Sequence, residues 1–151
     1  MKYPFKFYTT NHQFYIYDKS SPSDTSSDNF WTQAAYDDRL AIENGILGIG
    51  TECYGPVKGE VNLLDAPNTY VNFNDYDHIV EAGIKINSGT IQILNCPDSN
   101  IELELFVDPG IYKVRIYSSN LSSVEGDEGN DFYNVEIWPD TEMVRRVLKR
   151  F

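Results

Sequence analysis

The sequence predicts a mainly β protein: an antiparallel β-sandwich of about eight strands, with a short helix near residues 31–40 and a C-terminal helix. Three observations lead to this class. Most segments alternate apolar and polar residues with a period of two, which places successive side chains on opposite faces of a sheet. Turn residues separate these segments at intervals of about 8 to 12 residues. Aromatic residues make up 14% of the 151 residues, including 11 Tyr and 8 Phe, and aromatics favour strands.

The predicted strands are short and follow one another along the whole chain. The clearest is 101–105, where three aliphatic residues alternate with Glu102 and Glu104. Between two apolar runs, Asn87-Ser88-Gly89 predicts a tight hairpin, because Gly accepts the positive φ that such turns need. Asp108-Pro109-Gly110 predicts a second turn. In chain order, the strand segments are 5–7, 14–16, 46–49, 57–64, 79–86, 91–93, 101–105, 111–117 and 132–138.

Two segments break the alternation and predict helices. In the first, 28–41, Trp31, Ala34, Ala35 and Tyr36 have helical spacing, and Asp28 or Asn29 is available as the N-cap. The second lies within 139–151 and has Asp140 or Thr141 as its candidate cap. Its cations lie toward the C-terminal end, where the helix dipole favours them. Its apolar stripe, which we expect to dock on the sandwich, is Val144, Val147, Leu148 and Phe151.

Length and composition predict one folded domain over residues 1–151, long enough to bury roughly two-thirds of the surface that the unfolded chain exposes. The first residues contain no apolar run or cleavage site typical of a signal peptide, and no stretch approaches the roughly 18 apolar residues of a membrane span. We therefore expect a cytoplasmic protein with no membrane partner. Cys53 and Cys96 are too few for a disulfide framework, so we expect buried or half-buried thiols.

Charge is distributed unevenly along the chain. The formal net charge is −11, yet residues 1–142 hold all 23 acidic residues and only 8 of the 12 basic ones, which gives them −15. The remaining cations are Arg145, Arg146, Lys149 and Arg150. An acidic body repels nucleic acid and attracts positively charged surfaces. The sequence therefore predicts a basic protein partner and no direct nucleic-acid ligand.

No motif for catalysis, for a metal or for a cofactor stands out, and we expect a protein that is not an enzyme. The two histidines, His12 and His78, have no partner at a metal or triad spacing. Spacing alone leaves open a triad built on Cys53 or Cys96, because such residues meet only in the fold, but neither cysteine has a neighbour that supports it. We therefore predict no catalytic residues, no metal ligands and no cofactor.

The acidic loops leave an alternative open. Residues 124–131 contain four acids and two glycines, and calcium takes six to eight oxygens from loops of this kind. The EF-hand pattern, with alternating acids, Gly at the sixth position and Glu at the twelfth, is not met. A β-sandwich module that binds calcium or carbohydrate is therefore the alternative function.

An acidic surface with aromatic anchors is also suited to recognise a basic protein. The acids cluster at 18–28, at 37–43 with the 75–77 turn, and at 125–131, whereas Glu102 and Glu104 look like ordinary solvent-facing strand positions. Loops at one end of a sandwich often converge into a binding surface. The predicted partner-binding residues are Tyr36, Asp37, Asp38, Asp75, Tyr76, Asp77, Asp127 and Glu128.

Three short motifs in the first third of the chain resemble the competence protein J family: HQFYIYDK at 12–19, WTQAAY at 31–36 and AIENGILGI at 41–49. Members of that family are small acidic cytoplasmic inhibitors of a DNA-entry nuclease. Segments 109–117 and 132–139 resemble small bacterial proteins of toxin and immunity loci. The resemblance implies an immunity-type inhibitor that binds and neutralises a basic nuclease toxin, either an RNase or a DNase. It brings no catalytic residues with it.

Overall fold

The computed structural model describes residues 1–151, and strands make up most of its regular structure. One α-helix and two single-turn 3₁₀ helices accompany eleven strands. In chain order the elements are β1 (Lys2–Phe7), β2 (Gln13–Asp18), α1 (Gln33–Asp38), β3 (Leu40–Glu43), β4 (Ile46–Gly50), β5 (Val57–Leu63), η1 (Phe73–Asp75), β6 (His78–Ile86), β7 (Thr90–Leu94), β8 (Ile101–Phe106), β9 (Gly110–Ser119), η2 (Leu121–Ser123), β10 (Phe132–Pro139) and β11 (Arg146–Lys149).

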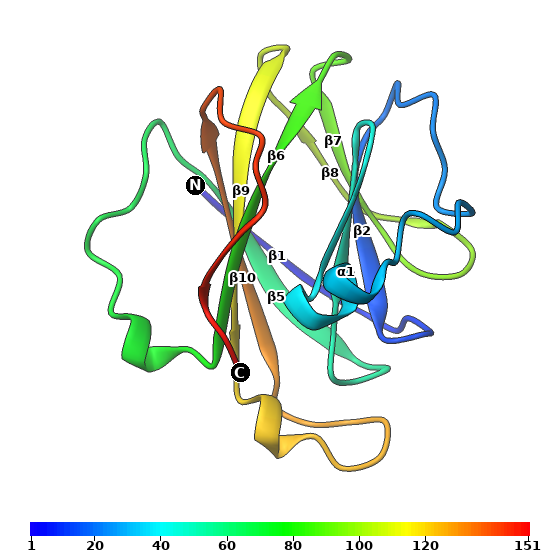
Figure 1. Cartoon of the computed structure of the whole chain (residues 1–151), viewed down its shortest axis with the longest axis vertical. Coiled ribbons are helices and arrows are strands. Elements are labelled where there is room, and N and C mark those ends of the chain that lie inside the picture. Colours follow the sequence, from blue (N-terminus) through cyan, green and yellow to red (C-terminus); the bar gives the residue numbers. More distant parts are fainter.

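The strands form two sheets (Figure 1). The first, sheet A, has six strands in the order β1-β5-β10-β9-β6-β11, and the second, sheet B, has five in the order β3-β4-β2-β7-β8. All neighbouring strands are antiparallel except β5 and β10, which run parallel with Val135 beside Val61. The prediction of purely antiparallel sheets is wrong at this pair. Residues 64–131 lie between β5 and β10, so no tight turn fixes their relative direction.

The hydrophobic core lies between the sheets, because its main cluster of 24 buried residues takes side chains from both. The period-2 pattern explains which side chains enter it. On β10, Tyr133, Val135 and Ile137 belong to the cluster, whereas the alternate residues Asn134 and Glu136 lie on the other face of sheet A. A second cluster of seven buried residues, which includes Tyr15, Phe30 and Ala35, packs α1 against sheet B.

The helix predicted near residues 31–40 is present as α1, but it begins later than its predicted caps. Thr32, not Asp28 or Asn29, is the N-cap, and its hydroxyl accepts a hydrogen bond from the Ala35 amide at 3.1 Å. The turn before it ends at Phe30, which is buried in the second cluster. The helix ends at Arg39, which adopts the left-handed conformation with φ 62°.

The predicted C-terminal helix is wrong, because the segment is extended and contains strand β11, which pairs with β6. An isolated helix of this length is marginal in water, whereas β6 offers an unpaired edge that satisfies the backbone groups of the segment. Val147 pairs with Val80 and packs against the core, but Val144 of the predicted apolar stripe is 61% exposed. In Figure 1 this segment crosses in front of sheet A.

The predicted turn at 87–89 forms, but it does not close a hairpin. Gly89 has φ +73°, as its role in a turn requires, yet β6 belongs to sheet A and β7 to sheet B. The turn therefore carries the chain from one sheet to the other. Both cysteines are free thiols and buried, as expected. None of the helices has the length and hydropathy needed to cross a bilayer.

Candidate partner-binding surface

Helix α1 presents Tyr36 and Asp37 to solvent. Tyr36 is 58% exposed, and its ring packs on that of Trp31 with 5.1 Å between the centroids. The Asp37 carboxylate accepts a hydrogen bond from Gln33 Nε2 at 3.0 Å, one helical turn earlier. Because α1 is capped by Thr32 and buries Ala35 against sheet B, these two side chains are presented by a fixed element.

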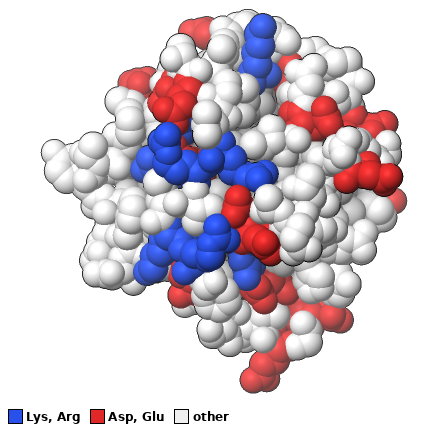
Figure 2. Space-filling view, viewed as in Figure 1, with Lys and Arg blue, Asp and Glu red and all other residues white.

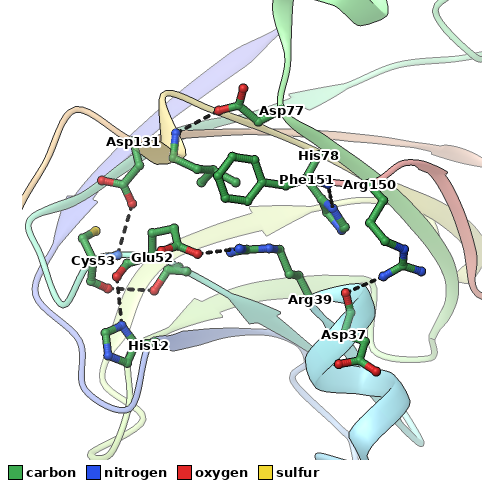
Figure 3. A network of polar contacts seen from close by, with 12 residues as sticks. His12, Asp37, Arg39, Glu52, Cys53, Asp77, His78, Asp131, Arg150 and Phe151 are labelled. Atoms are coloured by element: carbon green, nitrogen blue, oxygen red, sulfur yellow. Dashed lines mark hydrogen bonds and ion pairs between the residues drawn. The ribbon is translucent and has the colours of Figure 1, made fainter. Parts of the chain in front are cut away.

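Asp38, the next residue, is engaged within the protein. Its carboxylate binds Arg145 Nε at 2.9 Å and Arg150 Nη2 at 2.7 Å. Partial burial opposes ionisation, but the two guanidinium groups outweigh it and lower the pKa of Asp38. The Asp38 carbonyl also accepts a hydrogen bond from His78 Nε2 at 2.8 Å. Figure 3 shows the other ring nitrogen, His78 Nδ1, which accepts a hydrogen bond from the Phe151 amide at 3.2 Å. The C-terminal residues thus tie α1 to the start of β6.

The 75–77 turn lies directly before His78. Asp75 is exposed, and Tyr76 is half-buried with its ring 4.9 Å from that of Tyr117. The Asp77 carboxylate accepts a hydrogen bond from the Leu121 amide at 2.9 Å, at the start of η2 (Figure 3). Asp77 therefore has a structural task, because it joins this turn to the segment that leads into the third acidic stretch.

That third stretch, 125–131, is held by backbone hydrogen bonds. The Glu125 amide donates to the Glu128 carbonyl at 2.9 Å, and the Tyr54 amide donates to the Asp127 carbonyl at 2.9 Å. The side chains of Asp127 and Glu128 are exposed. The loop therefore presents its acids from a backbone that is anchored at several points.

Hydrogen bonds connect two of the predicted regions to their neighbours: His78 bonds to the Asp38 carbonyl at the end of α1, and Asp77 bonds to the Leu121 amide at the start of η2. The eight predicted residues nevertheless differ in what they can offer a partner. Asp38 and Asp77 are used internally, and Tyr76 packs on Tyr117. The residues that are exposed and, where acidic, make no ion pair within the chain are Tyr36, Asp37, Asp75, Asp127 and Glu128.

Sequence reasoning missed a cleft of about 280 Å³ beside α1. Trp31, Tyr36 and His12 line it, together with Arg39 and Glu52, which form an ion pair. His12 stacks on Tyr54 with 4.2 Å between ring centroids. The WTQAAY motif contains Trp31 and Tyr36 of this cleft, but no pattern in the sequence indicates that His12 and Glu52 line the same cleft.

The basic C-terminal segment also has a role that sequence reasoning missed. Figure 2 shows Lys and Arg gathered on the face that this segment crosses, with Asp and Glu around them. Several of these cations are paired within the protein: Arg145 and Arg150 with Asp38, and Arg146 with Glu142 at 3.0 Å. The signal that could have revealed this is the complementarity between a short basic segment and the acidic chain that precedes it.

Cys53 and His78, which could have served as a nucleophile and a base, have environments that suit structural roles. Burial, reinforced by Asp131, raises the pKa of the Cys53 thiol to about 12, so the thiol is protonated at neutral pH. Burial lowers the pKa of His78, whose two ring nitrogens are both occupied by backbone groups. No group of three or more His, Cys, Asp or Glu side chains is arranged to hold a metal ion.

Comparison with known proteins identifies the fold. No protein family matches the sequence, and no curated protein matches it. Among solved structures, ComJ from Bacillus subtilis, described as an inhibitor of the DNA-degrading activity of NucA, superposes with a TM-score of 0.71 and 17% identity, over 93% of this chain and 98% of that chain. The protein described as crocagin biosynthetic gene J gives 0.56 and 16%, over 93% and 96%. The chain therefore has a ComJ-like fold, in agreement with the resemblance seen in its first third.

Proposed function

We propose that this protein is a cytoplasmic, immunity-type inhibitor that binds and neutralises a basic nuclease, either an RNase or a DNase toxin. The observation that carries the proposal is that Tyr36 is exposed and that four acids of the predicted contact set, Asp37, Asp75, Asp127 and Glu128, are exposed and form no ion pair within the protein. The shared fold with an inhibitor of a DNA-degrading enzyme adds support.

The physical basis is competition with a polyanion. A nuclease that grips nucleic acid carries Lys and Arg around its cleft, and an acidic surface can occupy that cleft as a substitute for the substrate. The net charge of −11 accelerates encounter with such an enzyme. Close contact by an aromatic anchor, surrounded by groups that exclude water, then supplies most of the affinity.

The test is inhibition of the nuclease encoded beside the gene for this protein. We expect the two proteins to co-purify and the nuclease activity to fall in proportion to the inhibitor added, with an equivalence point at a fixed ratio. Tyr36→Ala should weaken inhibition about tenfold or more, since loss of an aromatic anchor costs at least about 1–2 kcal/mol.

The matched control is Phe106→Ala, because Phe106 is 74% exposed and lies at the end of β8, outside the predicted contact set. It should leave inhibition unchanged. A neighbouring product that is neither a nuclease nor a toxin, or a nuclease that remains fully active at excess inhibitor, would contradict the proposed function.

A further inference from the structure

A polar cavity of about 140 Å³ lies on the outer face of sheet A, away from the core. Strands β5, β9 and β10 form its floor, and the 64–77 loop supplies another part of its wall. The residues used in the argument below are Glu60, Asn68, Tyr76, Tyr117, Asn134 and Glu136.

Glu136 lines this cavity and forms no ion pair with any cation of the protein. Its residue is 7% exposed, and one carboxylate oxygen, Oε2, accepts a hydrogen bond from Asn68 Nδ2 at 3.1 Å. The other oxygen, Oε1, is buried and has no hydrogen-bond partner.

The cation that could have neutralised Glu136 is committed elsewhere. Arg115 lies opposite Glu136 in the β9–β10 register, but its guanidinium donates to Glu81 Oε1 at 2.8 and 3.1 Å. It also lies over the Trp138 ring, 5.0 Å from the centroid, and donates to the Tyr117 hydroxyl at 3.3 Å. Burial raises the pKa of Tyr117, and the Glu136 carboxylate raises it further. Even so, the Tyr117 hydroxyl makes no hydrogen bond to Glu136 Oε1, which has no donor.

A buried carboxylate without a counterion is costly, by several kcal/mol, so such a group is normally paired or hydrogen-bonded. The cavity has roughly ten times the volume that one water molecule requires by the same measure. The cavity therefore has room for a ligand group larger than water. Glu136 Oε1 lacks a hydrogen-bond donor and its carboxylate lacks an ion-pair partner, and a positively charged donor would supply both.

We propose that this cavity binds a guanidinium group, with the Glu136 carboxylate as its counterion. The source of the guanidinium rests on the proposed function: it belongs to an arginine side chain of the basic partner. A guanidinium carries five N–H donors in one plane and has two weakly hydrated faces. The oxygens of Glu136, Glu60 and Asn134 can accept from its edge, and the half-buried ring of Tyr76, which packs on Tyr117, offers aromatic surface to one of its faces.

Other cations fit the cavity less well. An ammonium group has only three donors and no flat face for the Tyr76 ring, and no cluster in the protein is arranged to hold a metal ion. The chain's own Lys2 reaches Glu60 at the rim, at 3.5 Å, but its side chain is 66% exposed and makes no ion pair with Glu136.

The test begins with the isolated protein and needs no nuclease. Nα-acetyl-arginine methylamide is titrated while the side-chain amide signals of Asn68 and Asn134 are followed by NMR. We expect saturable shifts, and binding about tenfold or more weaker in Glu136→Gln, since a hydrogen bond to a charged group contributes about 1.5–3 kcal/mol. Glu102→Gln, on the exposed strand β8, is the control and should bind like the wild type. The corresponding lysine compound should bind several-fold more weakly.

Absence of saturable shifts, equal binding by Glu136→Gln, or equal binding of the lysine compound would each overturn the assignment. Glu136→Gln keeps the shape of the side chain and removes an unpaired buried charge, so its thermal midpoint should not fall, and a folded variant keeps the test valid. If Glu136→Gln unfolds, Asn68→Ala replaces it, because Asn68 comes from the covering loop and should weaken arginine binding too.

A second arm identifies the source of the guanidinium. If it comes from the partner, Glu136→Gln should raise the dissociation rate of the nuclease complex, and the arginine compound should compete with complex formation. Arginine binding combined with a complex that Glu136→Gln leaves unchanged would overturn the partner as the source and point to a free small molecule. Arginine binding by a protein that inhibits no nuclease would contradict the proposed function while leaving the cavity assignment standing.

Discussion

At the scale of single residues, Asp18 shows how one buried carboxylate can organise a turn far away in sequence. It is 1% exposed and accepts hydrogen bonds from the Ser88 hydroxyl, from the amides of Asn87 at 3.0 Å and Ser88 at 3.2 Å, and from the Ser20 hydroxyl at 2.9 Å. Burial opposes its ionisation, but these donors outweigh burial and lower the pKa of Asp18. The turn between β6 and β7 therefore depends on the end of β2.

Asp18→Asn should destabilise the protein by about 2 kcal/mol at neutral pH, because it removes a charged acceptor from buried donors. The folded-state pKa lies below the unfolded value of about 3.9, so this contribution is present above that pH and is lost as pH falls through the folded-state pKa. Urea denaturation at pH 7 and pH 3 measures both effects. Asp28→Asn, at an exposed position, should leave stability within about 0.5 kcal/mol of the wild type.

His78 predicts a second pH dependence, in a different range. Burial lowers its pKa below the unfolded value of about 6.5; the Asp38 carbonyl opposes this shift, and the charges of Arg39 and Arg150 add to it. The unfolded state then binds the proton more readily, so stability is complete above about pH 6.5 and falls as pH drops toward the folded-state pKa, by about 1.4 kcal/mol for each pKa unit of the shift.

Chemical denaturation at pH 7.5 and pH 5 should show this loss in the wild type and a smaller loss in His78→Gln, which cannot titrate in this range. His12→Gln is the control, since His12 is exposed and the variant keeps His78. A wild type and a His78→Gln variant with the same pH profile would refute the assignment.

The sequence located the exposed acids of the candidate surface but not their roles. Clustering alone pointed to Asp75, Asp127 and Glu128, which are exposed. It could not distinguish Asp77, which binds the Leu121 amide, because that contact depends on where η2 lies. Glu136 occupies a position in the period-2 pattern that normally faces solvent. It is buried because the 64–77 loop folds over that face of the sheet, which the sequence pattern does not reveal.

At the scale of secondary-structure elements, period-2 alternation succeeded where one face of a segment is buried. It located the segments that became β8, β9 and β10. It failed for the C-terminal segment, whose apolar spacing also fits a helix, because a free edge on β6 decides between the two conformations. Propensity is a weak guide in so short a segment when a tertiary partner satisfies its backbone.

The C-terminal segment covers the Lys113–Glu81 ion pair, whose two side chains are each 4% exposed with 3.0 Å between Nζ and Oε2. Gly83 permits this close approach. A Cβ at Gly83 would lie 2.7 Å from Met143 Cα and 2.8 Å from the Glu142 carbonyl oxygen, both of them backbone atoms. Burial of the ion pair therefore depends on the absence of a side chain at residue 83.

Gly83→Ala should displace the C-terminal segment and destabilise the protein by about 1–3 kcal/mol, the usual cost of overpacking. Thermal denaturation gives the stability, and limited proteolysis followed by mass spectrometry should show faster cleavage within 140–151. For Gly110→Ala the nearest atom to the added Cβ lies 3.9 Å away, so this control should change neither measurement. Equal behaviour of the two variants would mean that residue 83 does not set the position of the segment.

At the scale of the whole molecule, internal pairing reduces the effect of the C-terminal cations on the rest of the surface. Arg145 and Arg150 are used on Asp38, and Arg146 on Glu142, so the exposed acids at 75, 127 and 128 keep their charge uncompensated. Charges of this kind act mainly on the rate of association with a basic partner.

The triple variant Asp75→Asn, Asp127→Asn, Glu128→Gln should therefore associate with the nuclease about tenfold more slowly at low ionic strength, with little change in the dissociation rate. The difference should nearly vanish at 1 M salt, where the screening length is about 3 Å. Surface plasmon resonance over a salt series measures this. The control, Asp98→Asn, Glu102→Gln, Glu104→Gln, removes three charges elsewhere, and equal slowing by both triples would show that net charge alone attracts the partner.

The parallel pair β5–β10 also has a consequence for how the chain folds during synthesis. Within sheet A, β5 has only two neighbours, β1 and β10, and β10 leaves the ribosome after every other strand of this sheet except β11. Until Phe132–Pro139 has emerged, β1 and β5 have no connection to the rest of their sheet, and a two-stranded ribbon is marginally stable in water. Sheet A should therefore form late and in one cooperative step, and a ribosome-bound chain that has not yet exposed β10 should remain sensitive to protease throughout β1 and β5.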